Sequence, residues 1–181
     1  MRVLGVDPGS TATGFGLVER SGGTIRHLRH GVLRTPKGAD LPERLHFLHA
    51  ELQSVLLEER PDMAVVERVF LASNARSALV LGQARGALLA SLGEARVPVS
   101  ELAARQVKKA VTGTGAADKS QMQGMVARLL GLERPPATDA ADALALALAF
   151  AQAGPLAELP VRRRRGSQRR SLTRLVLERS R

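Results

Sequence analysis

The sequence predicts one α/β domain with a five-stranded mixed sheet flanked by helices. Three observations support this. Three short strand-like segments come first, and helical segments then alternate with two further short apolar runs. The chain has 181 residues, of which 44% are hydrophobic, which is enough for one packed core. Strands joined by turns form an antiparallel meander, whereas strands separated by helices pair in parallel.

The first three expected strands are separated by turn signals. Residues 2–7 form a short apolar run that ends at Asp-Pro-Gly, a sequence typical of a turn. Residues 13–18 alternate and have glycines nearby, which indicates the second strand of a hairpin. Residues 24–33 form a third, less regular strand.

Helices and short strands alternate through the rest of the chain. Apolar residues from Leu41 to Leu56 lie on one helical face, and Pro61 ends that helix. A short buried strand then ends at Glu67, and Ser73 or Asn74 caps the helix that follows. The expected elements are helix 41–60, strand 63–66, helix 74–95, strand 98–101, and helices 103–111, 118–130 and 139–153.

The positive charge is concentrated at the C-terminal end. The net charge is +10, but residues 161–181 hold nine arginines and one glutamate, which leaves residues 1–160 at only +2. We therefore expect a folded domain at 1–160 and a basic, arginine-rich tail at 161–181. Such a tail either binds a polyanion or is simply solvated.

Composition also excludes several classes of protein. The chain has no cysteine, which excludes disulfides, cysteine-ligated zinc and thiol catalysis. The N-terminal segment reaches Asp7 too early for the apolar region of a signal peptide. The longest apolar stretch, 143–151, is nine residues long, against the roughly 20 that span a bilayer. We expect a soluble cytoplasmic protein that does not bind a membrane.

Four carboxylates occupy the ends of predicted elements. Asp7 closes the first strand and Glu67 the fourth, so both emerge at one sheet edge if these strands are parallel neighbours. Asp139 and Asp142 are three residues apart at the start of the last helix and share a face. Converging carboxylates repel one another unless a cation lies between them. Oxygen-only ligation suits Mg²⁺ or Mn²⁺, and two such ions about 4 Å apart can hydrolyse a phosphodiester.

Each carboxylate also has a simpler explanation. Asp7 can open a turn, and Asp139 and Asp142 are acids of the kind favoured at a helix start, with Thr138 as the cap. Glu67 is harder to explain in this way, because a carboxylate directly after Met-Ala-Val-Val ends a buried strand.

Seven segments of the chain carry a specific pattern: residues 3–10 (Val-Leu-Gly-Val-Asp-Pro-Gly-Ser), 13–16 (Thr-Gly-Phe-Gly), 66–70, 81–86, 104–108, 111–115 and 139–145. These segments resemble the RuvC family of bacterial Holliday-junction resolvases, in the family's order and from the first residues to at least Ala149. The resemblance implies a ribonuclease-H-like fold and a homodimer that resolves four-way DNA junctions by paired symmetric nicks, in homologous recombination and DNA repair. It also implies RuvA–RuvB branch-migration proteins as partners.

The same resemblance assigns roles to individual residues. Asp7, Glu67, Asp139 and Asp142 would form the catalytic set and hold the metal, expected to be two Mg²⁺ ions with Mn²⁺ as a possible substitute. Lys119 would join them in catalysis, and it matches, like Lys108, a basic position near the cleaved strand.

Three further residues have two interpretations each. Lys109 either contacts DNA or is a solvated helix lysine. Phe70 either stacks on a base opened at the junction or packs in the core. Arg68 stands where a neutral polar residue is expected, and it either contacts phosphate or changes how Glu67 is held.

The helix at 74–95 contains two glycines, Gly82 and Gly86, four residues apart. Small residues at this spacing allow a close approach, either to the chain's own sheet or to the same helix of a second copy. The helix is apolar on more than one side, which favours the dimer.

Three other functions compete with junction resolution. A relative of the same fold could act on RNA or on other nucleic acid structures. An actin-like ATP-binding protein needs two lobes, and 181 residues without a second strand–Asp-x-Gly unit are too few for this. A junction-binding protein without catalysis would not need its carboxylates, yet all four are present.

Overall fold

The computed structural model describes residues 1–68 and 74–154, and it confirms the predicted order of elements. Phe70 and the basic tail lie outside the described residues, as does the domain boundary expected at residue 160. Element ends differ from the predicted ones by no more than a few residues. The elements are β1 (Arg2–Asp7), β2 (Ala12–Ser21), β3 (Thr24–Arg34), α1 (Leu41–Glu59), β4 (Met63–Glu67), α2 (Ala75–Glu94), β5 (Val99–Leu102), α3 (Ala104–Thr112), α4 (Lys119–Leu129) and α5 (Thr138–Ala153).

The five strands form one mixed sheet in the order β3-β2-β1-β4-β5. The pairs β1–β2 and β2–β3 are antiparallel, and the pairs β1–β4 and β4–β5 are parallel. The parallel register pairs Val6 with Val66, so the next residues, Asp7 and Glu67, end neighbouring strands at one edge of the sheet. The mixed sheet and this meeting of strand ends are therefore as predicted.

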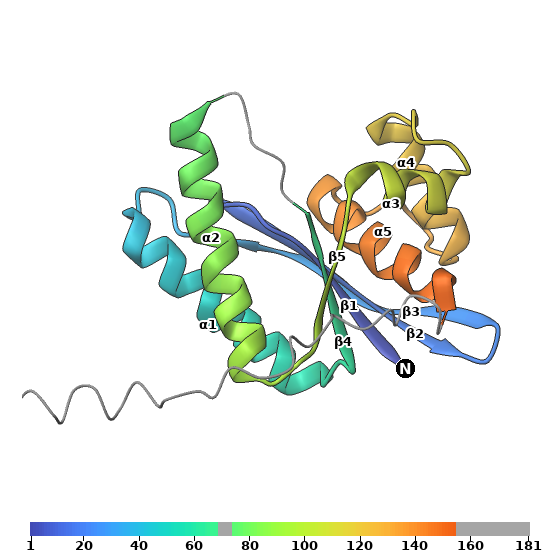
Figure 1. Cartoon of the computed structure of the whole chain (residues 1–181), viewed down its shortest axis with the longest axis horizontal. Helices are drawn as coiled ribbons and strands as arrows, with labels where there is room; N and C mark the ends of the chain where they lie inside the picture. The colour runs from blue at the N-terminus through green and yellow to red at the C-terminus, as the bar shows by residue number, and fades with distance from the viewer. Residues whose placement is uncertain (69–73, 155–181) are drawn as a thin grey trace, which may run out of the picture.

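Helices cover both faces of the sheet (Figure 1). One face packs on α1 and α2, where Leu4 and Val6 of β1 belong to a core with Leu48 and Leu88. The opposite face packs on α5, and α3 and α4 pack in turn on α5. Because side chains alternate along a strand, Val3, Gly5 and Asp7 of β1 all belong to the face covered by α5.

Helix α5 lies unusually close to the sheet because three glycines on β1 and β2 leave room for its backbone. A Cβ atom on Gly5 would lie 1.9 Å from the carbonyl oxygen of Ala143, and one on Gly14 would lie 1.9 Å from that of Asp139. A Cβ on Gly16 would lie 2.6 Å from the Cγ of Leu144. Since Gly14 is opposite Asp7 in the β1–β2 register, this contact also sets the position of the start of α5 relative to Asp7.

Candidate active site

A cavity of about 360 Å³ opens where β1 and β4 end against α3, α4 and α5. Three of the four predicted carboxylates line it, and so do two of the predicted lysines. Asp139 and Lys109 are not among the lining residues. The lining side chains are Asp7, Glu67, Asp142, Lys108 and Lys119, with Ala104, Val107, Met122, Ala145 and Leu146 forming an apolar wall.

Asp7 lies at the centre of this group, and its surroundings disfavour its negative charge. Burial is the largest cause, followed by the carboxylates of Asp142, Glu67 and Asp139, and together they raise its pKa to about 7 although Lys119 opposes them. An ordinary aspartate in water has a pKa near 4. A carboxylate with such a pKa is a ready ligand for a cation, because a cation relieves the repulsion.

The other carboxylates act on one another in the same way. The pKa of Glu67 is raised by burial and then by Asp142. The pKa of Asp142 is raised by burial and by Asp139, whereas Lys119 and Lys108 lower it. Asp139 is thus close enough to influence Asp7 and Asp142 electrostatically, although it does not line the cavity.

The turn after Asp7 is held in place by a buried threonine. The Thr13 hydroxyl donates to the Gly9 carbonyl oxygen at 3.0 Å, and the Gly9 N–H reaches the same hydroxyl oxygen at 3.3 Å. Thr13 is fully buried. The Asp-Pro-Gly turn is therefore a fixed support for Asp7. The sequence carried a signal for it, since the threonine follows closely in the next strand, but its role was not predicted.

Helix α4 carries Lys119 in its first turn, and a capping box between Asp118 and Gln121 fixes the start of this helix. The Asp118 carboxylate accepts from the Gln121 N–H at 2.8 Å, and the Gln121 side-chain oxygen accepts from the Asp118 N–H at 2.9 Å. Helix α5 begins differently: its N-cap is Ala137, and no side chain caps it. The interpretation of Thr138 as the cap is therefore wrong. Thr138 is the first helical residue, and its hydroxyl oxygen instead accepts from the Gln123 side-chain amide at 3.3 Å.

The donor set suits a hard divalent cation, but it is not closed into a coordination shell. Oxygen-only donors of this kind select Mg²⁺ or Mn²⁺. Among residues 1–68 and 74–154, however, no three carboxylate or histidine side chains are arranged so that they would hold one metal ion. The residues fit such an ion by their chemistry and mutual influence, and the carboxylate side chains must converge further to bind it.

The Arg68 side chain pairs with a carboxylate outside the cavity. Its Nε lies 3.7 Å from a Glu101 carboxylate oxygen on β5, and the other oxygen of Glu101 is bound by Arg85 of α2. The Arg68 N–H donates to the Leu102 carbonyl oxygen at 2.9 Å, which extends the β4–β5 ladder past Glu67. Arg68 therefore ties the end of β4 to β5 and α2, and it does not line the cavity with Glu67.

The two glycines of α2 do not contact the sheet. A Cβ added to Gly82 or Gly86 would meet no atom within 4 Å. Close packing of these glycines on the chain's own sheet, the first of the two alternatives, is therefore wrong.

Asn74 is confirmed as the cap of this helix, because its side-chain oxygen accepts from the N–H groups of Arg76 and Ser77.

Within the described part of the chain, no helix is both long and apolar enough to cross a bilayer.

The fold and the acidic cavity together define a nuclease of the ribonuclease-H-like class. Residues 3–150 match the family model of the crossover junction endodeoxyribonuclease RuvC. The enzyme of that name from Bordetella parapertussis is 50% identical over 156 residues, which is 86% of each chain. The enzyme from Burkholderia mallei is 48% identical over 154 residues, or 85% of each. The chain thus belongs to the RuvC family.

A solved structure supports the assignment independently. The structure of Thermus thermophilus RuvC in complex with a Holliday junction substrate matches with a TM-score of 0.80 and 37% identity, over 86% of this chain and 96% of the other.

Proposed function

We propose that this protein is an endodeoxyribonuclease that resolves four-way DNA junctions by paired, symmetric nicks during recombination and repair. The observation that carries the proposal is the cavity at the ends of β1 and β4, where Asp7, Glu67 and Asp142 meet beside two lysines. Nuclease chemistry on a polyanion needs both groups, because carboxylates bind the metal and lysines bind phosphate.

The four carboxylates have one role in this proposal. Asp7, Glu67, Asp139 and Asp142 hold two divalent cations, with Mg²⁺ as the physiological ion and Mn²⁺ as a substitute. When bound, these ions supply a nucleophilic water and stabilise the leaving oxygen. Asp7 is the central ligand because it lies at the end of the middle strand and is influenced by the other three carboxylates.

The basic residues position the DNA. Lys119 and Lys108 line the cavity and contact the phosphate at the cleaved bond, where they offset the negative charge that develops in the transition state. Lys109, which is exposed next to Lys108, contacts the backbone farther away. Arg68 and Phe70 complete the contacts, and Arg68 must leave Glu101 to take part.

We further propose that two copies assemble through α2, so that two sites cut opposed strands of one junction. Leu79 on this helix is 65% exposed, and Gly82 and Gly86 face open space. These residues follow one another by three and four positions, the spacing of a helical stripe that packs on a partner helix. The wider partners would be the RuvA–RuvB branch-migration proteins of the cytoplasm.

One cleavage experiment separates this function from its rivals. The protein is incubated with a mobile four-way DNA junction, with a DNA duplex and with an RNA–DNA hybrid, each with Mg²⁺ and with EDTA. We expect paired nicks on the junction alone, only with metal, and none with Asp7→Asn. Binding without nicks would indicate a junction-binding protein, and cleavage of the hybrid would indicate a relative that acts on RNA.

A further inference from the structure

A second cavity, of about 380 Å³, opens at the same end of the sheet, between the β1–β2 loop, the end of β3 and the start of α1. We call it the β3–α1 cavity. Its polar lining consists of three cationic side chains and two hydroxyl groups, and no carboxylate lines it. These residues are Arg34, Lys37, Arg44, Thr11 and Thr35.

No carboxylate among residues 1–68 and 74–154 neutralises the cations of this cavity. Neither Arg34, Lys37 nor Arg44 forms an ion pair with any residue that the structure describes. The arginines that do form ion pairs are Arg2, Arg26, Arg29, Arg68 and Arg85, each with a glutamate. Isolated surface cations are normally solvated, but three around one concave surface create a local positive potential that suits an anion.

Hydrogen bonds hold the walls of the cavity together. The N–H and hydroxyl of Thr35 both donate to the Thr11 carbonyl oxygen, at 3.0 and 3.2 Å. The Arg44 Nε donates to the Ser10 carbonyl oxygen at 2.7 Å. Gly38 has a φ of 80°, a left-handed conformation that favours glycine and fixes the turn before α1. The backbone of the cavity is thus preformed, which lowers the entropic cost of binding.

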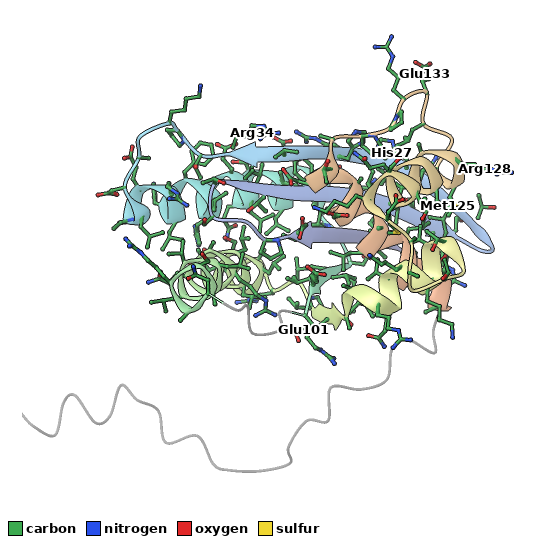
Figure 2. All side chains as sticks on the ribbon, turned by 90° about the horizontal axis from the view of Figure 1, so that it is seen from above. His27, Arg34, Glu101, Met125, Arg128 and Glu133 are labelled. Atoms are coloured by element: carbon green, nitrogen blue, oxygen red, sulfur yellow. The ribbon has the colours of Figure 1, made fainter. Side chains whose placement is uncertain are left out.

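The strand register places this cavity beside the active site. Asp7 of β1 is opposite Gly14 of β2, and Arg34 of β3 is opposite Ala12 of β2. Arg34 therefore lies two strands away from Asp7 and two residues farther toward the sheet edge at which β1 ends. Strands about 4.8 Å apart, with a rise of about 3.4 Å per residue, separate the backbones of Asp7 and Arg34 by roughly 12 Å. Figure 2 shows Arg34 on β3 and Glu101 on β5 at opposite sides of the sheet, so the carboxylates at the ends of β1 and β4 lie between these two sides.

We propose that the β3–α1 cavity binds a phosphate group of the DNA backbone a few nucleotides from the cleaved bond. The Arg34 guanidinium can contact two phosphate oxygens at once, Lys37 adds a point charge, and the Thr11 hydroxyl can donate a hydrogen bond. Arg44 mainly fixes the β1–β2 loop. Together with Lys108 and Lys119 on the other side of Asp7, this cavity aligns the strand across the carboxylates. The inference rests on the proposed function for the identity of the DNA.

The test is the salt dependence of junction binding in EDTA, so that no cleavage intervenes. The variant is Arg34→Gln with Lys37→Gln. The matched control is Arg20→Gln with Arg26→Gln, which removes the same charge near the opposite end of the β2–β3 hairpin. Each lost phosphate contact lowers the slope of log K against log salt by about 0.9, and at about 0.1 M salt it lowers affinity by about an order of magnitude. We expect this loss in the variant and a clearly smaller one in the control.

An independent arm leaves the protein unchanged and alters the DNA. Single phosphates on either side of the cleaved bond are replaced by uncharged methylphosphonates. One neutral position a few nucleotides away should weaken binding of the wild type and have little effect on the Arg34–Lys37 variant. If each methylphosphonate weakened binding by the same factor in the wild type and in the variant, the proposal would be overturned. A lower overall affinity of the variant would not affect this comparison, because each factor is measured within one protein.

Two other outcomes have a definite meaning. If inorganic phosphate raises the melting temperature of the wild type but not of the variant, while the DNA slopes of both agree, the cavity binds a small anion and the proposal is wrong. If the wild type binds a junction no more tightly than a duplex, the proposed function fails. The slopes measured on duplex still decide whether the cavity contacts the backbone.

Discussion

Replacing Asp7 with asparagine should stabilise the metal-free protein at neutral and alkaline pH while it abolishes cleavage. The folded protein holds the Asp7 proton up to a pH of about 7, whereas the unfolded chain releases it near 3.8. At about 1.4 kcal/mol per pH unit, this difference sets a ceiling of about 4 kcal/mol on the destabilisation that the ionised carboxylate causes. Solvent screening of a partly exposed group reduces it, so we expect a gain of about 2 kcal/mol.

The pH dependence has a definite sign. Well below pH 3.8 Asp7 is protonated in both states, and the wild type and the variant should be nearly equally stable. As the pH rises from about 4 to about 7, the unfolded wild type loses this proton before the folded state does, so wild-type stability falls. The variant lacks this loss, so the two free energies of unfolding diverge with pH and stay apart above pH 7.

Urea denaturation in EDTA, at several pH values from 4 to 8.5, measures this difference. A gain of about 2 kcal/mol corresponds to a rise of about 4–8 °C in melting temperature for a domain of this size. Asp40→Asn is the matched control, because Asp40 is exposed and caps α1, where asparagine caps equally well. In separate measurements without EDTA, added Mg²⁺ should stabilise the wild type but not the Asp7 variant. A variant no more stable than the wild type at pH 8, or a gap that does not change with pH, would refute the reasoning.

Four further predictions follow from other parts of the molecule. Gly14→Ala should lower the free energy of unfolding by about 1–3 kcal/mol in urea denaturation and impair cleavage, because the new Cβ would meet the Asp139 carbonyl oxygen. The control Gly124→Ala, whose Cβ would meet no atom within 4 Å, should have neither effect. Lys119→Met should slow single-turnover cleavage at saturating protein by about 100-fold, and it should lower junction affinity by only about the tenfold expected for one lost phosphate contact. Gly86→Glu should shift the protein toward a monomer in analytical ultracentrifugation, and an unchanged dimer would contradict the proposed α2 interface. Deleting residues 162–181 should lower the salt slope of junction binding by several units, at about 0.9 per phosphate, while cleavage at low salt survives; an unchanged slope would exclude the tail from DNA binding.

Most of the fold was predictable from local patterns. Apolar alternation and helical spacing are set by neighbouring residues, so strands and helices could be placed to within a few residues. The meeting of Asp7 and Glu67 was predictable too, because it requires only that two parallel strands end together. Helical spacing placed Asp139 and Asp142 on one face of the last helix, but strand order alone does not bring that face to Asp7 and Glu67. The resemblance to RuvC implied that the four carboxylates form one set.

The unpredicted features depend on contacts between distant segments. Arg68 follows Glu67 directly, yet its side chain pairs with Glu101, a residue that reaches it only through the β4–β5 pairing. The sequence of α2 fixes the spacing of Gly82 and Gly86 but not the side of the helix that packs on the rest of the protein. That these glycines face outward could therefore not be predicted. The β3–α1 cavity likewise joins residues from three segments.

The glycine contact beneath α5 has a consequence for how the enzyme tolerates change. The distance between Asp7 and the start of α5 is set by one backbone resting on another, at Gly5 and Gly14, and not by interlocking side chains. Substitutions among the leucines of the opposite core can therefore alter stability without altering the geometry of the carboxylates. Directed evolution toward a more heat-resistant enzyme should find most of its freedom on the α1–α2 side of the sheet, and almost none along the glycines of β1 and β2.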